Sequence, residues 1–171
     1  MSAPPQAKTD LSKHIIARIE AVAPTISHQE LGLVYHRPEQ WAEPSQCFEN
    51  AARKVRQDSG RTQFGWTFHH RLVEAFCGPG YLFATHHAVW HAPDGRLINV
   101  TPYPDAKHYP LPRPGGDILF LVDDKAQPIV TDKLVAPLPL RFFPLSDEDG
   151  LVAYVKQLND DEQEKCRRIT R

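Results

Sequence analysis

The chain has 171 residues, 20 basic and 21 acidic side chains and a hydrophobic fraction of 41%. This length favours a single domain over residues 1–171, and the balanced charge argues against a nucleic-acid or anionic-membrane partner. No run of about 18 apolar residues is present, and the first residues lack the pattern of a secretory signal. We therefore expect a cytoplasmic protein, with signal-less secretion or injection into another cell left open.

The first sixty residues predict two helices. Residues 1–8 are polar and are expected to form a flexible tail. Apolar residues at helical spacing follow, and this helix should end at Pro24. Residues 27–35 are interpreted as a short helix or a turn. A second helix is expected after Ser45, a good N-cap residue, and should end at Gly60.

The middle of the chain predicts strands. Residues 65–68 and 71–76 have strand character and are followed by a turn at residues 77–80. Residues 81–91 are rich in aromatic and β-branched side chains, and residues 96–101 return after a turn. These last two segments should form a β-hairpin.

The last seventy residues alternate irregular and regular segments. Five prolines in residues 101–116 predict a long loop, and the apolar run 118–122 predicts a strand buried on both faces. Prolines within residues 133–143 restrict that segment to an edge strand or an irregular crossing. A helix capped by Ser146 should run to about residue 158, with a charged extension over residues 160–171. The order of elements gives an α+β fold with a mostly antiparallel sheet.

Cys47 lies in the first turn expected for the second helix. Unpaired backbone N–H groups and the helix dipole at this position favour the thiolate over the thiol. An inert, buried cysteine is the alternative interpretation. The other cysteines, Cys77 and Cys166, are distant in sequence and lack C-x-x-C spacing, which argues against a disulfide framework or a cysteine zinc site.

The hairpin turn fixes which side chains share a face. The sequence Pro93-Asp94-Gly95 is typical of a three-residue loop with the glycine in the left-handed region. This loop pairs Val89 with Asn99 and His87 with Thr101. Residues opposite each other share a face, so His87 and Asn99 become diagonal neighbours, close enough for the amide to hold the imidazole.

These residues resemble the papain-like cysteine peptidase superfamily, which uses Cys, His and Asn or Asp in this chain order. The similarity rests on Cys47 at a helix start, His87-Ala88-Val89 on one strand and Leu97-Ile98-Asn99 on the next. The stretch from Cys47 to Asn50 is also similar to the cysteine motif of arylamine N-acetyltransferases. Compact bacterial amidohydrolases and transglutaminase-like proteins share the same order. The resemblance implies a papain-like core, with the nucleophile helix packed on the sheet.

The resemblance also implies a role for each residue. Cys47 would attack a carbonyl, His87 would act as base and then protonate the leaving amine, and Asn99 would orient the ring. Gln40 or Gln46 would help the backbone N–H of Cys47 to stabilise the oxyanion. The implied activity is thiol-dependent hydrolysis of a peptide, isopeptide or side-chain amide bond in a protein or peptide-like substrate, without a cofactor.

Several alternatives stay open at this point. The same triad could serve an acyltransferase, or the fold could be a catalytically silent binding module. His86 could replace His87 as the base. A zinc site from His87, His91 and His108 is conceivable but lacks a supporting motif.

Overall fold

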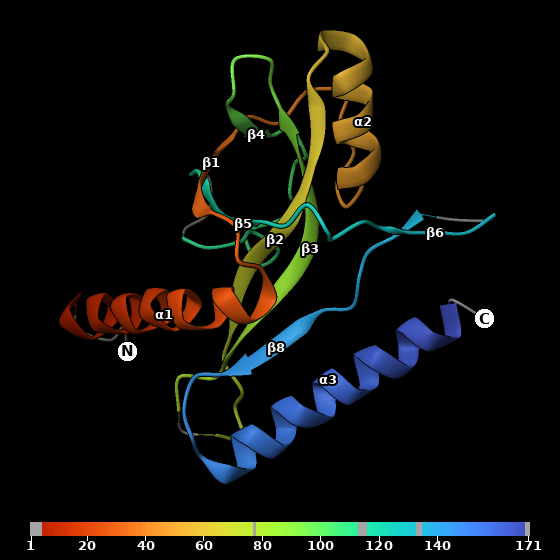
Figure 1. Ribbon diagram of the computed structural model, residues 1–171. Helices are drawn as coiled ribbons and strands as arrows, with labels where there is room; N and C mark the ends of the chain where they lie inside the picture. The colour runs from red at the N-terminus through yellow and green to blue at the C-terminus, as the bar shows by residue number, and fades with distance from the viewer. Residues whose placement is uncertain (1–4, 77, 113–115, 133–134, 170–171) are drawn as a thin grey trace.

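The computed structural model describes residues 5–76, 78–112, 116–132 and 135–169, and in these ranges the chain forms three helices and eight strands. The fold is mixed α+β, with the helices placed around one twisted, barrel-like sheet (Figure 1). Within the described part of the chain, no helix is both long and apolar enough to span a bilayer.

The main sheet has six strands in the order β2-β5-β1-β4-β3-β8, and β2 also pairs with β3. The first five strands of this order therefore close on themselves. The β1–β4 pair is parallel, and the other pairs are antiparallel. The strands are β1 (Leu31–His36), β2 (Arg61–Arg71), β3 (Tyr81–His91), β4 (Leu97–Asn99), β5 (Ile118–Val122) and β8 (Arg141–Pro144). A separate two-stranded sheet contains β6 (Ile129–Val130) and β7 (Val135–Ala136).

Two hydrophobic cores lie on the two faces of this sheet. Inside the barrel, Val34, Val89, Ile118 and Phe120 pack together although β1 and β3 are not neighbours, so this contact crosses the barrel. On the outer face, helix α1 (Pro5–Ile26) packs on β2 and β3. The members of this second core are Ile15, Ile19, Val22, Ala23, Trp66, Phe68, Leu82, Ala84, Leu121, Ala126 and Leu145.

Helix α1 differs from its expected bounds. It does not end at Pro24 but continues to Ile26, and residues 5–8 of the expected tail belong to it. Residues 1–4 lie outside the described part. Pro24 stands in the last turn, where its missing N–H removes one helical hydrogen bond, and the N–H of Ser27 still bonds to the carbonyl of Ala23 at 3.0 Å.

The segment expected as a helix or turn at residues 27–35 is instead largely strand β1. It lies between β4 and β5 in the middle of the sheet order. Its apolar side chains are partly on the outside, since Leu33 is 65% exposed while Val34 faces the barrel core. Pairing with β4 and β5 on its two edges, together with the burial of Val34, makes this segment a strand.

Strand β2 is also longer than expected. The sequence predicted strands at residues 65–68 and 71–76, but one strand runs from Arg61 to Arg71 and pairs with β3 along its whole length. The chain leaves the sheet after Arg71, so residues 72–76 are not a strand. Cys77, in the expected turn, lies outside the described residues.

The predicted hairpin between β3 and β4 is confirmed, although β4 ends at Asn99 and is shorter than expected. The N–H of Ala92 donates to the carbonyl of Arg96 at 2.9 Å, and the N–H of Gly95 donates to the carbonyl of Ala92 at 3.0 Å. Gly95 has a φ of 88°, which a three-residue loop of this type requires. Trp90 pairs with Ile98, which is the register expected from the turn.

The C-terminal elements confirm the edge strand but not the cap. Strand β8 lies at the end of the sheet order, whereas Pro137 and Pro139 precede it in residues 137–140, which are irregular. Helix α3 runs from Asp149 to Ile169, so it takes in most of the charged extension. Ser146 does not cap it, because the helix begins three residues later and the Ser146 hydroxyl is buried without a hydrogen-bond partner among the described residues.

Part of one edge of β3, next to the candidate site, is not paired with another strand. Strand β2 occupies the other edge completely, while β4 pairs only with Trp90 and His91, and β8 only with residues 81–84. No strand among the described residues therefore pairs with residues 85–89 on this edge. Helix α2 (Cys47–Asp58) packs beside β3 (Figure 1), where Cys47 contacts Ala88.

Candidate active site

Cys47 is the first residue of helix α2, as expected, but the cap differs. Gln46, not Ser45, occupies the N-cap position, and no side chain caps the helix. The N–H of Asn50 donates the first helical hydrogen bond to the carbonyl of Gln46 at 2.8 Å. Ser45 instead has a φ of 64°, a left-handed conformation that is costly for a residue with a side chain. This turn directs the chain into the helix at the cysteine.

Asn50 holds that turn in place, a role that sequence analysis missed. Its side chain is buried and bonds the backbone of Glu43 twice, accepting from the N–H at 3.2 Å and donating to the carbonyl at 2.8 Å. It also donates to the hydroxyl of Thr101 at 3.1 Å. Asn50 therefore ties the start of the cysteine helix to the segment that follows Asn99.

The surroundings of Cys47 do not favour its thiolate overall. The side chain is 8% exposed and packs with Ala51 and Ala88. Burial raises the pKa of the Cys47 thiol to about 11, although hydrogen bonds from the backbone at Ala88, Phe48 and Cys47 oppose this shift. The expectation that the helix start lowers this pKa is therefore wrong, because loss of hydration outweighs the N–H groups.

The predicted contact between His87 and Asn99 is present. His87 Nε2 lies 3.0 Å from Asn99 Oδ1, and both side chains are buried. The backbone N–H of Thr101 donates to the same oxygen at 3.2 Å, which fixes this end of the amide as an acceptor. The proton of His87 is therefore on Nε2, and Nδ1 keeps its lone pair. Burial lowers the pKa of His87 to about 4, against the effect of the Asn99 bond.

His36 completes this arrangement from strand β1 and was not predicted. Its backbone pairs in register with Asn99, and Asn99 Nδ2 lies 2.9 Å from His36 Nδ1. Because the amide nitrogen is a donor, Nδ1 of His36 is the acceptor. The same amide nitrogen donates to the hydroxyl of Tyr103 at 3.2 Å and to the carbonyl of Thr101 at 3.3 Å. Hydrogen bonds therefore hold both the oxygen and the nitrogen of the buried Asn99 amide.

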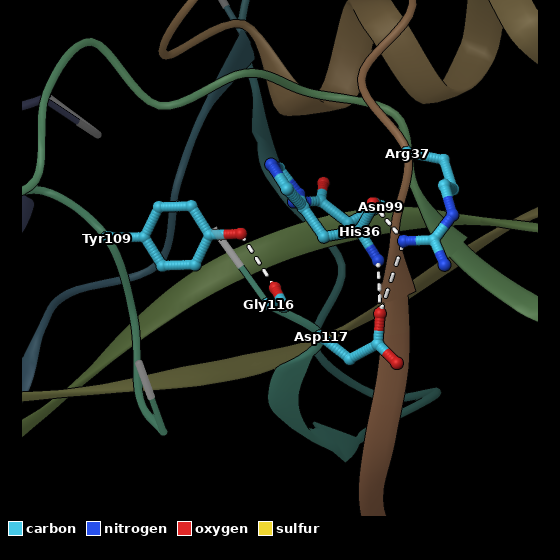
Figure 2. A network of polar contacts seen from close by, with 6 residues as sticks. All are labelled: His36, Arg37, Asn99, Tyr109, Gly116 and Asp117. Carbon is cyan, nitrogen blue, oxygen red and sulfur yellow. Dashed lines mark hydrogen bonds and ion pairs between the residues drawn. The ribbon is translucent and has the colours of Figure 1, made fainter. Parts of the chain in front are cut away.

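Charged and aromatic groups keep His36 in position (Figure 2). Asp117 Oδ1 accepts from the backbone N–H of His36 at 3.2 Å and from Arg37 Nη1 at 3.4 Å. The imidazole stacks on Tyr103, with ring centroids 5.4 Å apart, and meets the edge of Tyr109 at 5.1 Å. The Tyr109 hydroxyl donates to the carbonyl of Gly116 at 2.7 Å. Sequence analysis missed His36 because it did not recognise β1.

His86 uses both of its ring nitrogens in structural hydrogen bonds. Nε2 lies 2.7 Å from the carbonyl of Ala126, and the N–H of Leu138 donates to Nδ1 at 2.9 Å. Nε2 must therefore carry the proton, and neither nitrogen is left to act as a base. This geometry favours His87 over His86 for that role.

Cys47 and His87 line the same cavity, whose volume is about 340 Å³. Of the two glutamines expected near the nucleophile, Gln46 lines this cavity. Gln40 is exposed in the turn before α2 and is not among the described residues of the lining. The described residues that line it are Ser45, Gln46, Cys47, Phe48, Thr67, His69, Arg71, Phe83, Thr85, His86, His87, Thr101, Pro102, Tyr103, Pro104, Lys107, His108, Val135 and Pro137.

The alternative zinc site has no geometric support. Arg61 Nε donates to His91 Nδ1 at 2.9 Å, and His91 lines a different cavity from His87 and His108. Within the residues that the structure describes, no group of three or more His, Cys, Asp or Glu side chains is placed to hold a metal ion.

The buried imidazoles predict loss of stability in acid. Burial lowers the pKa of His69, His86 and His87 from 6.5 to about 4. The unfolded chain gains these protons near pH 6.5, whereas the folded chain does so only near pH 4, so stability is full above 6.5 and falls as the pH drops between these values. Each histidine contributes a slope of up to about 1.4 kcal/mol per pH unit.

Urea titrations at pH 7, 6 and 5 measure this loss. The free energy of unfolding should fall faster from pH 6 to 5 than from 7 to 6. His69→Gln should reduce the slope of this free energy against pH by up to about 1.4 kcal/mol per pH unit, the contribution of one proton. A free energy of unfolding that stays constant over this range would contradict the burial of these rings as neutral groups.

Comparison of the chain with protein-family models, with curated proteins and with solved structures gives no match. The chemistry of the site therefore rests on the arrangement of Cys47, His87, Asn99 and His36.

Proposed function

We propose that the protein is a thiol-dependent hydrolase with a papain-like core, which cleaves an amide bond in a peptide or protein through an acyl-enzyme on Cys47. One observation carries the proposal: Cys47, at the start of a helix, and His87, bonded to Asn99 at 3.0 Å, line the same cavity. Nucleophile, base and orienting group follow one another in this chain order. A thiol, a histidine base and a group that orients the base are the three components that nucleophilic catalysis by cysteine requires.

The protonation states determine how the first step proceeds. With a raised pKa for Cys47 and a lowered pKa for His87, both groups are neutral at pH 7. His87 Nδ1 therefore removes the thiol proton as sulfur attacks the carbonyl carbon, instead of acting on a thiolate formed beforehand. The sulfur–carbon bond forms and the carbonyl electron pair moves to oxygen. The N–H of Cys47 and the side chain of Gln46 are the donors proposed for this oxyanion.

Collapse of the intermediate completes the reaction. The carbon–nitrogen bond breaks, and the imidazolium of His87 returns its proton to the leaving amine. Water then attacks the thioester, with His87 again taking a proton, and the carboxylic acid and the Cys47 thiol are released. Asn99 Oδ1 accepts the Nε2 proton of His87 throughout, so the ring keeps its orientation.

Acylation by p-nitrophenyl acetate tests this proposal without knowledge of the natural substrate. A burst of p-nitrophenol should be accompanied by one acetyl group on Cys47, located by mass spectrometry after acid quenching. His87→Ala should slow the burst by about 100-fold or more, because general-base catalysis contributes on that order. Equal labelling of Cys47 and Cys166, or a burst insensitive to His87→Ala, would count against the enzyme and favour the silent binding module.

The pH dependence of the burst tests whether Cys47 and His87 are both neutral before the reaction. Only neutral His87 can act as base, and its neutral fraction falls as the pH drops through its lowered pKa of about 4. The burst rate should therefore be half-maximal near pH 4 and level at neutral pH. A rate that rises steadily toward pH 11 would show reaction through free thiolate, without help from His87. Added hydroxylamine tests the acyltransferase alternative, since a transferase would deliver the acetyl group to the amine faster than to water.

A further inference from the structure

The cavity of the candidate active site is a groove that extends from His87 along β2 and β3. Two cross-strand pairs of β2 and β3 line the groove in succession. The first is Thr67 with Thr85, and the second is His69 with Phe83. A strand rises about 3.3 Å per residue, so Phe83 lies about 13 Å along β3 from His87. We call the part of the groove around His69 and Phe83 its distal end.

The formal charges on this groove are of one sign. Arg71 and Lys107 line it, whereas none of its described lining residues is an aspartate or glutamate. The whole chain has 20 basic and 21 acidic side chains, so the asymmetry is local. His108, also in the lining, contacts Asp105 at 2.8 Å, and in the part of the chain that the structure describes, Arg71 and Lys107 are the arginine and lysine of the lining that have no carboxylate partner.

Arg71 presents its guanidinium at the distal end. The side chain reaches back over the ring of Phe83, with the guanidinium carbon 5.6 Å from the ring centroid. Among the described residues, Arg71 forms no ion pair with a carboxylate. A guanidinium held on an aromatic ring and facing a groove without carboxylates is suited to bind a carboxylate of a ligand.

We infer that the distal end of the groove binds an acidic side chain or terminal carboxylate of an extended peptide, about four residues from the bond that reacts with Cys47. The rise of β3 from His87 to Phe83, whose ring the Arg71 guanidinium covers, sets this spacing, and Thr67 and Thr85 line the groove between them. The inference rests on the proposed function and adds to it a substrate class, acidic peptides. Arg71 is the residue that determines this specificity.

Binding to the Cys47→Ala chain tests the inference separately from the chemistry. The probes are two capped octapeptides, acetyl-Glu-Ala-Ala-Gly-Gly-Ala-Ala-Glu-amide and the same peptide with both glutamates replaced by glutamine. Their symmetry places a charge at the required distance from the central bond for either direction of binding. By calorimetry at low salt, the acidic peptide should bind roughly fivefold more tightly, and 1 M NaCl should remove most of this preference.

Substitutions locate the charge that is responsible. Arg71→Gln should abolish the preference for the acidic peptide, so that the two peptides bind about equally. Arg71→Lys should keep most of this preference. Arg61→Gln is the matched control, because Arg61 lies at the opposite end of the same strand and lines a different cavity. Equal affinities in the unsubstituted groove, or a preference that survives Arg71→Gln, would overturn the inference. The inference would also be overturned if Arg61→Gln abolished the preference as completely as Arg71→Gln.

The two proposals fail in different ways. Acylation of the native chain by p-nitrophenyl acetate involves no anionic ligand, so the burst tests the hydrolase proposal without the carboxylate site. If the burst is absent but the acidic peptide is still preferred, the carboxylate site stands and the hydrolase proposal falls. If the burst is present without any preference for the acidic peptide, the hydrolase proposal stands and this inference falls.

Discussion

Cys47→Ala is expected to reduce acylation by at least about 1,000-fold while the fold persists. In the proposed mechanism the sulfur forms the bond to the substrate, and no other thiol among the described residues lines the cavity. The side chain packs between Ala51 and Ala88, so alanine leaves only a small void at this position. Loss of one buried atom costs about 1 kcal/mol, and the unfolding temperature should fall by only a few degrees.

Cys166→Ala is the matched control for this experiment. Cys166 is on helix α3 and borders a second cavity, so its replacement should change neither the burst nor the unfolding temperature appreciably. The two properties must be measured together, by stopped-flow acylation and thermal circular dichroism. Retained acylation in Cys47→Ala would remove the sulfur from the mechanism. Loss of both acylation and folded signal would identify Cys47 as a core residue.

The part of the site that was predictable follows from local chemistry. The loop ending at Gly95 needs a residue with positive φ, and Gly95 stands where that conformation is required. This fixed the hairpin register, and the alternation of side chains along strands then placed His87 beside Asn99. Both steps use only residues within one hairpin, which is why the 3.0 Å contact could be expected without any knowledge of the rest of the fold.

The unpredicted part depends on contacts distant in sequence. His36 reaches Asn99 only because β1 pairs with β4, more than sixty residues later. The signal that could have identified β1 was the alternation around Val34, but the exposed Leu33 on the opposite face obscured it. The raised pKa of Cys47 likewise arises from burial against Ala88, whereas the sequence revealed only the helix start.

Asn99→Ala is expected to lower the burst rate by roughly 100-fold with little change in peptide affinity. The amide fixes the proton of His87 on Nε2, so its loss frees the ring to adopt the unproductive tautomer or to rotate. The residue is fully buried, and each partner left without a hydrogen bond costs about 1–3 kcal/mol, so stability also falls. Asn159→Ala is the control, because Asn159 bonds the backbone of Phe142 on both sides but lies away from the cavity.

Asn99→Asp distinguishes an orienting role from a purely structural one. The carboxylate still accepts from His87 Nε2, so acylation should largely persist at neutral pH. Its second oxygen meets His36 Nδ1, which must now carry a proton to make the contact that the amide makes at 2.9 Å. The negative charge favours the imidazolium of His87 and raises its pKa, so less neutral base is present at a given acidic pH. The half-maximal pH of the burst should therefore move above 4, and His36→Ala in this background should abolish the rescue. An unchanged pH profile would show that Asn99 only supports the fold.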